Sequence, residues 1–375
     1  MSYRYDAAFI DPGLNTLVAP TPTISYYLYD WGRNTEGQLG LGNTTNRSSP
    51  TQVGSLTDWA TVSTGYYHFL ATKTDGTLWS WGSGNFGRLG LGNTTYYFSP
   101  KQVGALTNWA SVNAGYYGSF AIKTDGTLWV WGGNFNGQLG LGNTTNYSSP
   151  KQVGALTNWS KINGGIATTT LAIKTDGTLW AWGNNSFGQL GLANTTTYSS
   201  PKQVGGLTNW LNVYVANQNS MAIKTDGTIW TWGRNQLGQL GLGNTTYYSS
   251  PKQVGALTTW SSLSGTYHAL AIRNNGALWT WGYNAQGQLG LGDTTNRSSP
   301  VQIGALTNWL SVAAGYYHSV SIKTDGTLWA WGQNAYGQLG TGNLTYRSSP
   351  NQVGSLTSWG RLFSGSGDST AALLI

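Results

Sequence analysis

The sequence has no cysteine and little charge. Among 375 residues there are 12 acidic side chains, 19 Lys and Arg together, and three histidines. The absence of cysteine excludes disulfide bonds and thiolate metal sites and fits folding in a reducing compartment. No run of eighteen apolar residues occurs, and the N-terminus has no basic segment followed by a continuous apolar one. Neither a membrane span nor a conventional signal peptide is therefore visible.

The formal net charge of +7 does not come from a basic patch. Lys and Arg are dispersed along the chain, so nucleic acid is not an expected partner. Gly (54), Trp (20) and Tyr (22) are abundant instead. This composition is typical of many short strands joined by tight turns, and it predicts an all-β protein.

The chain is a sevenfold repeat of about fifty residues. The dipeptide Trp-Gly recurs at Trp31, Trp81, Trp131, Trp182, Trp232, Trp281 and Trp331. A second marker, the Trp of the LTxW motif, recurs at Trp59, Trp109, Trp159, Trp210, Trp260, Trp309 and Trp359. A period near fifty indicates a solenoid, a propeller or an array.

The pattern inside one repeat favours the propeller. Residues 108–115, 119–124 and 127–131 each suit a strand, and Asp125-Gly126 between the last two predicts a hairpin with a type I′ turn. A fourth short strand fits the SSPKQV motif, and four antiparallel strands describe a propeller blade. Both faces of the LWVW strand are apolar, so its two tryptophans are expected in the core between blades.

The two ends of the chain predict how the ring closes. The last repeat stops after residues 370–375, where the others turn through Asp-Gly, and the first begins with residues 25–32, the strand that should follow. We therefore expect a seven-bladed β-propeller over residues 24–375, with one blade assembled from both termini. Residues 1–23 are left over as an N-terminal arm outside the ring.

Several motifs recur together in a known spacing. Residues 65–92, GYYHFLATKTDGTLWSWGSGNFGRLGLG, resemble the repeat of the regulator of chromosome condensation family, and the likeness covers about residues 25–375. The resemblance implies a seven-bladed propeller with shared terminal strands. Members include a nucleotide exchange factor, ubiquitin-ligase domains and secreted bacterial inhibitors, which commonly grip another macromolecule with a propeller face. The repeat spacing leaves no room for the insertion that the exchange factor uses, so exchange activity is not expected.

The polar residues do not form a recognisable catalytic or metal site. Five aspartates occupy the hairpin turn, Glu36 is the only glutamate, and the three histidines share one position of the repeat, at His68, His268 and His318. The GQLGLG motif lacks the Lys-Ser/Thr and the helix of a phosphate loop. We expect no enzyme activity, no catalytic residue, no cofactor and no metal.

The repeats differ from one another mainly in two connections of each blade. Antiparallel strands place the first and third connections on one face, and the near-invariant second and fourth on the other. Drift of exposed loops would affect both faces, so we favour a binding face, which Tyr, Asn, Phe and Arg suit. The candidate binding residues are Tyr66, Tyr67, Phe86, Tyr96, Tyr97, Tyr116, Tyr117, Phe135, Tyr147, Phe187, Tyr198, Asn217, Gln218, Arg234, Tyr247, Tyr248, Tyr267, Tyr283, Arg297, Tyr316, Tyr317, Tyr336 and Arg347.

The leading functional hypothesis is a non-enzymatic recognition propeller of a virion surface or phage tail. It would be assembled in the cytosol, dock on the particle through residues 1–23, and present the variable face to a receptor, either a glycan or a protein. The near-identical repeats favour a phage or bacterial source. The alternative is a cytoplasmic protein-binding inhibitor or regulator of the family's type; an enzyme ranks third.

Overall fold

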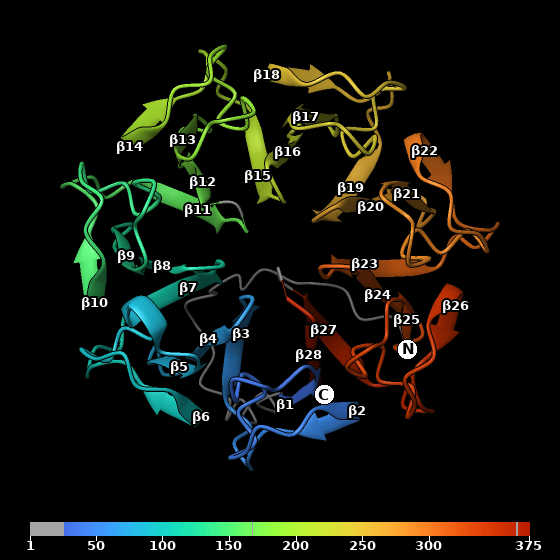
Figure 1. The fold of residues 1–375 in the computed structure, drawn as a ribbon, viewed down its shortest axis with the longest axis horizontal. Coiled ribbons are helices and arrows are strands. Elements are labelled where there is room, and N and C mark those ends of the chain that lie inside the picture. Colours follow the sequence, from blue (N-terminus) through green and yellow to red (C-terminus); the bar gives the residue numbers. More distant parts are fainter. Residues whose placement is uncertain (1–25, 167, 365–366) are drawn as a thin grey trace, which may run out of the picture.

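The structure is a computed structural model that describes residues 26–166, 168–364 and 367–375. Seven sheets of four antiparallel strands stand around a common axis (Figure 1). This confirms the expected seven-bladed β-propeller. The expected N-terminal arm, residues 1–23, lies outside the described residues.

The strands follow one another blade by blade. Blade 1 holds β3 (Trp59–Thr64), β4 (His68–Lys73), β5 (Leu78–Gly82) and β6 (Tyr97–Gln102), with the short 3-10 helix η1 (Asn85–Gly87) between the last two. The other strands are β7 (Trp109–Ala114), β8 (Gly118–Lys123), β9 (Leu128–Gly132) and β10 (Tyr147–Gln152) in blade 2; β11 (Trp159–Gly164), β12 (Thr169–Lys174), β13 (Leu179–Gly183) and β14 (Tyr198–Gln203) in blade 3; β15 (Trp210–Val215), β16 (Asn219–Lys224), β17 (Ile229–Gly233) and β18 (Tyr248–Gln253) in blade 4; β19 (Trp260–Gly265), β20 (His268–Arg273), β21 (Leu278–Gly282) and β22 (Arg297–Gln302) in blade 5; β23 (Trp309–Ala314), β24 (His318–Lys323), β25 (Leu328–Gly332) and β26 (Arg347–Gln352) in blade 6; and β27 (Trp359–Ser364), β28 (Ser369–Leu374), β1 (Tyr27–Gly32) and β2 (Arg47–Gln52) in blade 7.

Blade 7 closes the ring with strands from both ends of the chain. Strand β28 pairs with β1 along its whole length, from Tyr27 opposite Leu374 to Gly32 opposite Ser369. The Trp31 indole then donates a 3.0 Å hydrogen bond to the Gln338 carbonyl of blade 6. The closure expected from the complementary termini is confirmed.

The predicted hairpin forms at every Asp-Gly, but the turn type expected from the sequence is wrong. In blade 1 the Gly76 amide donates to the Lys73 carbonyl at 2.9 Å, and Lys73 in turn pairs with Thr77, so three residues form the loop. Of the three loop residues, Thr74, Asp75 and Gly76, only Gly76 has a positive φ, of 77°. This is the three-residue loop with a glycine bulge, not the two-residue type I′ turn. The Asp75 carboxylate stabilises it by accepting hydrogen bonds from the Thr77 amide at 2.9 Å and hydroxyl at 2.6 Å.

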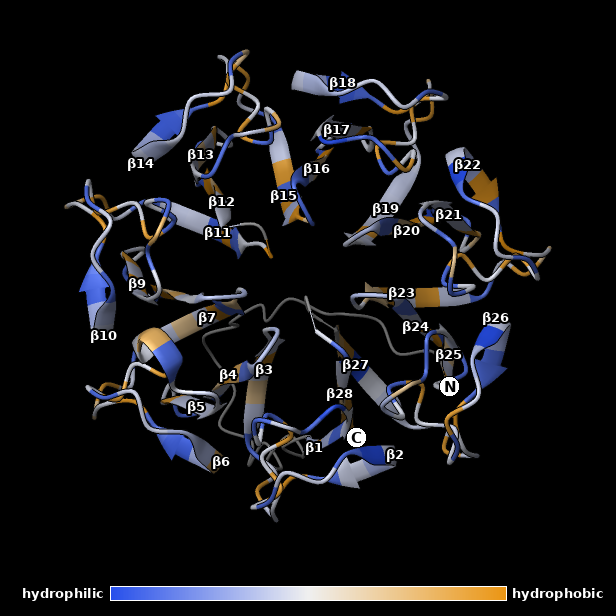
Figure 2. Ribbon diagram, in the orientation of Figure 1, coloured by the Kyte–Doolittle hydropathy of each residue, from blue (hydrophilic) through white to orange (hydrophobic). Residues whose placement is uncertain are grey.

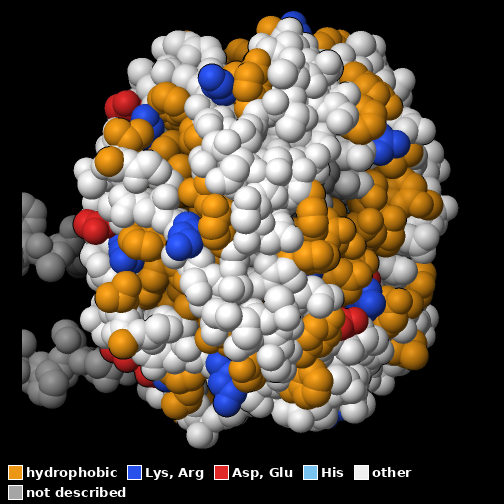
Figure 3. All heavy atoms as spheres, turned by 60° about the vertical axis from the view of Figure 1, so that its left-hand side comes forward, with side chains coloured by type: hydrophobic (Ala, Val, Ile, Leu, Met, Phe, Trp, Pro, Cys, Tyr) orange, Lys and Arg blue, Asp and Glu red, His pale blue; other side chains and the backbone are white. Residues whose placement is uncertain are grey.

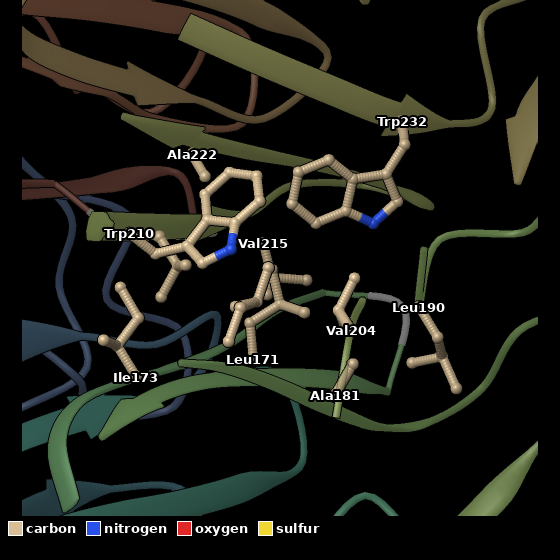
Figure 4. Close-up of a cluster of buried hydrophobic side chains, with 11 residues drawn as sticks. Leu171, Ile173, Ala181, Leu190, Val204, Trp210, Val215, Ala222 and Trp232 are labelled. Atoms are coloured by element: carbon tan, nitrogen blue, oxygen red, sulfur yellow. The ribbon is translucent and has the colours of Figure 1, made fainter. Parts of the chain in front are cut away.

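The core lies between blades, not at the centre of the ring. In Figure 4 the Trp210 and Trp232 indoles of blade 4 lie against aliphatic side chains of blade 3, among them Leu171 and Val204. Each Trp of a Trp-Gly pair is fully buried, and its indole donates a hydrogen bond of 2.8 to 3.1 Å to a backbone carbonyl of the preceding blade. Each blade is thus both packed and hydrogen-bonded to its neighbour.

In six blades the Trp-Gly strand carries a second tryptophan, which is less deeply placed than the sequence predicts. Trp129 is only half-buried, whereas Trp131 is fully buried. The Lys123 ammonium lies 4.0 Å from the centre of the Trp129 ring, and the indole donates to the Thr127 hydroxyl at 2.9 Å. This indole is therefore covered by a lysine of its own blade, and its edge remains exposed.

Hydropathy changes from the axis to the rim. The second strand of a blade, such as β8, is buried at all six positions. The outermost strands, such as β6, β10 and β26, are mainly hydrophilic (Figure 2). The edge strand that each blade presents to solvent is therefore polar, which disfavours pairing with a foreign strand.

Candidate functional site

The connections that vary between repeats gather on one face of the ring, which we call the mouth face. The first and third connections of a blade are hydrogen-bonded together, as the Ser83 amide is to the Tyr67 carbonyl at 2.8 Å. The second and fourth connections meet on the opposite face, where the Thr124 amide donates to the Asn108 carbonyl at 2.9 Å. The predicted division of the connections between two faces is confirmed.

Tyrosines from four blades form one contact network at the mouth face, which we call the tyrosine cluster. It consists of Tyr66, Tyr67, Tyr116, Tyr117, Tyr267, Tyr316 and Tyr317. Tyr66 of blade 1 lies 4.7 Å from Tyr116 of blade 2 and 5.4 Å from Tyr316 of blade 6, measured between ring centres. The contact with Tyr316 passes over blade 7, so these side chains reach inward over the mouth of the channel.

Three further aromatic side chains extend the cluster sideways. Phe86 and Phe135 contact each other and Tyr117 at 4.8 to 5.6 Å between ring centres. Tyr283 contacts Tyr267 and Tyr317 on the far side. Phe86 and Phe135 are 38% and 47% exposed, and the tyrosines are half-buried. A half-buried aromatic cluster supplies large contact area at little cost in side-chain entropy.

Blade 7 contributes a charged pair where blades 1 and 2 have a second tyrosine. The Arg33 guanidinium lies over the rings of Tyr66, Tyr67 and Tyr336 at 5.3 to 5.7 Å, and 3.9 Å from the Asp368 carboxylate. Burial raises the pKa of Asp368 to about 6, and Arg33 opposes that rise. Asp368 therefore changes its charge near neutral pH at the edge of the cluster.

The hydroxyls of Tyr66, Tyr316 and Tyr317 remain protonated at neutral pH. Burial raises the pKa of Tyr66 and of Tyr317 to about 12, and it also raises the pKa of Tyr316, whose hydroxyl lies 3.1 Å from that of Tyr267. Each neutral hydroxyl can both donate and accept a hydrogen bond. The cluster thus combines apolar ring surface with polar edges.

A channel cavity of about 280 Å³ is lined by the inner strands of all seven blades. Its wall contains hydrogen bonds that join neighbouring blades. The Asn113 carboxamide accepts from the Gly164 amide at 2.6 Å, and Asn163 does the same for the Val215 amide at 2.9 Å. These polar side chains are committed to backbone amides, so the wall has a structural role at these seams.

A second group of candidate residues lies around blade 4, which has no tyrosine in its first connection. The Arg234 guanidinium donates to the Gln218 side chain and lies 5.2 Å from the Phe187 ring centre. Phe187 in turn contacts Tyr247 at 5.8 Å. Asn217 joins blade 5 through its amide, which donates to the Thr266 carbonyl at 3.3 Å. The mouth face is therefore aromatic over blades 1, 2, 5 and 6 and polar over blade 4.

Six candidate residues do not join either group. They begin the outermost strands: Tyr97, Tyr147, Tyr198, Tyr248, Arg297 and Arg347. Tyr147 shows the role that the four tyrosines share, because its hydroxyl accepts from Asn143 at 3.2 Å and its ring lies beneath Lys151. Arg297 forms a 2.6 Å ion pair with Asp293, four residues earlier. These side chains hold the rim of the ring, which a comparison of repeats alone could not separate from the mouth.

Arg33, Asp368 and Arg88 lie at this face and were not selected from the sequence. Arg88 replaces the Gln of the GQLG motif in blade 1 alone, and it is 2% exposed. It lines a cavity of about 300 Å³ together with Tyr96 and members of the tyrosine cluster. The signal was the single letter by which GRLG differs from six copies of GQLG.

The three histidines join neighbouring blades. The Nε2 atoms of His68 and His268 lie 2.7 to 2.8 Å from the Ser119 and Ser319 hydroxyls of the next blade. The Ser119 hydroxyl donates a 2.6 Å hydrogen bond to the Arg88 carbonyl. It therefore accepts the hydrogen bond from His68, whose Nε2 carries the hydrogen. Burial lowers the pKa of His268 and of His318 to about 3, so both are neutral. Within the described ranges no cluster of three acidic or histidine side chains is arranged to hold a metal.

A comparison with protein families identifies the repeats. Residues 23–264 match the RCC1-like domain, and residues 275–322 and 325–373 match the regulator of chromosome condensation (RCC1) repeat, which is also matched at residues 309–338. The chain belongs to the RCC1-like family. A comparison with curated proteins found no match.

Solved structures share the fold of this RCC1-like propeller at low sequence identity. Human WBSCR16 is 20% identical, with a TM-score of 0.83 over 93% of this chain and 99% of its own. Prp20p from Saccharomyces cerevisiae, in a structure whose subject includes its binding to Gsp1p and histones, is 19% identical with a TM-score of 0.81 over 94% and 92%. Yeast RCC1 (Prp20) bound to Kap60 is 18% identical with a TM-score of 0.83 over 98% and 96%.

The outer surface of the RCC1-like propeller has few charges. Figure 3 shows separate hydrophobic patches, with Lys and Arg side chains placed singly between them. No helix in the described part of the chain is long and apolar enough to cross a membrane. On the side shown, the surface has no concentrated basic region of the kind that nucleic acid binding requires.

Proposed function

We propose that this RCC1-like propeller is a non-enzymatic protein-binding module that holds its partner at the mouth face. The observation that carries the proposal is the tyrosine cluster, in which half-buried rings from blades 1, 2, 5 and 6 meet over the channel. Tyrosine is enriched in protein interfaces because it combines a large apolar face with a hydrogen-bonding edge.

The arrangement of the mouth also favours a partner held in one orientation. The scaffold is sevenfold, whereas the mouth carries tyrosines on four blades, the Arg33–Asp368 pair on blade 7 and the Arg234 group on blade 4. The yeast structures named above concern binding to proteins, which agrees with this type of function. Their identities of 19% and 18% support the fold alone.

The test is loss of partner binding on truncation of the cluster. The double variant Tyr66→Ala/Tyr316→Ala removes the contact over blade 7, and Leu106→Ala/Leu156→Ala is the matched control, because these leucines are 49% and 46% exposed on the opposite face. Proteins captured from cells that make this chain are quantified for wild type and both variants, and the affinity of each differential partner is then measured in purified form.

We expect the tyrosine variant to weaken binding by about 30-fold or more, since a central interface tyrosine contributes about 2 kcal/mol. The leucine variant should bind as wild type does. Equal affinity of wild type and the tyrosine variant, with both folded by circular dichroism, would refute the use of the mouth face.

The virion or tail hypothesis ranks second. Half-exposed aromatic rings beside Asn217 and Gln218 also suit a sugar, which is the observation in its favour. A glycan array probed with the same variants tests it, since a glycan reader would bind one sugar family and lose it on truncation of the cluster. Deletion of residues 1–23 tests the arm: the ring should stay folded while attachment to a larger assembly is lost.

A further inference from the structure

Arg88 gives blade 1 a different third connection from every other blade. In the other copies the Gln of GQLG accepts a hydrogen bond from the amide two residues earlier, as Gln138 does from Asn136 at 2.9 Å. An arginine cannot accept, and here the connection forms the 3-10 helix η1 with Phe86 at a positive φ of 61°. A left-handed conformation is unfavourable for phenylalanine, so this loop is held by contacts that the other blades lack.

The guanidinium of Arg88 is buried without a negative partner. Its Nε donates to the Asn85 carbonyl at 2.9 Å and its Nη1 to the Tyr116 carbonyl at 3.1 Å, both neutral groups. Nη2 has no acceptor among the residues that the structure describes. The rings of Tyr67, Phe86 and Tyr117 surround the group at 5.5 to 5.8 Å. No described acidic side chain forms an ion pair with it.

Buried cations are normally paired, because removing a charge from water is costly and an opposite charge offsets that cost. Here the three aromatic faces supply part of the compensation. Arg88 lines the cavity of about 300 Å³, whose wall also contains Tyr96, Tyr116 and Glu36. The site is therefore a cavity with a positively charged guanidinium at its floor. Aromatic rings surround this group, and the cavity is open to a ligand.

The chemistry of the wall limits which anion fits. A guanidinium binds a carboxylate or a phosphate, and planar rings accept a short apolar stem. Glu36 adds a negative charge to the same wall. A doubly charged phosphate is disfavoured by that charge more strongly than a singly charged carboxylate.

We propose that this cavity binds one carboxylate, carried by an acidic side chain of the protein partner, which accepts hydrogen bonds from Arg88 while its stem packs against the rings of Phe86 and Tyr117. This inference deepens the proposed function and rests on it for the source of the carboxylate. It assigns to the mouth face one pocket with a defined chemistry, next to the broad tyrosine cluster.

The test uses two small probes, N-acetyl-glutamate amide and its neutral isostere N-acetyl-glutamine amide, titrated into the full chain and followed by saturation-transfer NMR. Arg88→Gln is the informative variant, because six blades already carry Gln at this position. Arg273→Gln is the matched control, since it removes one positive charge at the opposite face, outside the cavity and outside the candidate binding residues.

We expect the glutamate probe to bind wild type and Arg273→Gln equally, and to bind Arg88→Gln about tenfold more weakly or worse, the effect of one charge-assisted hydrogen bond. The glutamine probe should bind about tenfold more weakly than the glutamate probe, and inorganic phosphate should not displace the latter. Equal binding of both probes, an unaffected Arg88→Gln, an equal loss in Arg273→Gln, displacement by phosphate, or no binding to wild type would each overturn the carboxylate site.

The inference and the proposed function can fail separately. If partner capture depends on Tyr66 and Tyr316 while Arg88→Gln leaves partner affinity unchanged, the carboxylate site is wrong and the mouth face stands. If the glutamate probe requires Arg88 and no protein is captured through the mouth face, the pocket stands and protein binding through this face is wrong.

Discussion

Asp30 places a carboxyl group in the core, and we expect its replacement to stabilise the protein. It is fully buried in β1, and neither carboxyl oxygen has a hydrogen-bond partner. Burial raises its pKa well above the usual 3.8. The equivalent residues in other blades include Ser80 and Thr231, whose hydroxyls donate to the Leu89 and Leu240 carbonyls at 2.7 and 2.8 Å. Asp30→Thr should thus replace an unpartnered carboxyl with a side chain that this position accommodates.

The expected gain follows from two principles. A buried polar group without a partner costs about 1 to 3 kcal/mol, and the entropy of unfolding of 375 residues is about 0.8 kcal/mol per kelvin. Asp30→Thr should therefore raise Tm at pH 7 by about 1 to 4 °C. Differential scanning calorimetry of wild type, Asp30→Thr and the near-isosteric Asp30→Asn measures this, and Asn separates the loss of ionisation from the change in shape.

The pH dependence gives the sharper test. Asp30 keeps its proton to a higher pH in the folded protein than in the unfolded chain. Below about pH 3.8 the ionisation of Asp30 therefore does not reduce the stability of the protein, and the stability declines as the pH rises towards the folded-state pKa. The decline is at most about 1.4 kcal/mol per pH unit. The advantage of either variant should therefore grow from pH 4 upwards. A constant difference between variant and wild type, or a lower Tm for both variants at pH 7, would refute an ionisation cost at Asp30.

Two further predictions concern the seams between blades. Burial lowers the pKa of His268 to about 3, so the stability that His268 contributes is complete above about pH 6.5 and falls as the pH drops towards 3. The variant His268→Asn, which copies the residue that blade 4 carries at Asn219, should reduce the decrease of Tm at acid pH. An unchanged dependence of Tm on pH would contradict this. Asn113→Ala leaves the Gly164 amide without its 2.6 Å acceptor and should lower the unfolding free energy in urea by about 1 to 3 kcal/mol, and a loss below about 0.5 kcal/mol would show that the seam does not depend on this bond.

Most of the fold could be predicted because the same local sequence motifs recur in each repeat. The Trp-Gly and LTxW markers count the blades, Asp-Gly marks each hairpin, and the complementary ends predict the shared blade. The turn type was wrong because a three-residue loop and a two-residue loop both favour Asp and Gly, and the hydrogen bond from Gly76 to Lys73 distinguishes them only in three dimensions.

The candidate site could be predicted less well, because its contacts join residues far apart in the chain. The contact of Tyr66 with Tyr316 depends on how far each side chain reaches over blade 7, which repeat spacing does not determine. The same comparison grouped Tyr147 with the mouth, although its place at the start of an outermost strand puts it on the rim. Variation between copies identifies a face, but only packing separates the mouth of the channel from its edge.

The way in which the blades are joined explains why blade 1 tolerates an arginine at this position. The indole of Trp131 donates to the backbone carbonyl of Arg88 at 2.9 Å, and the indoles of Trp81 and Trp182 donate to Gln38 and Gln138 at the same distance. Every residue has a backbone carbonyl, so the hydrogen bond between the blades does not depend on which side chain stands at this position. The Arg88 side chain can therefore have a different role. An arginine that leaves the seam intact but is buried without a counter-charge is therefore better explained by a ligand than by folding.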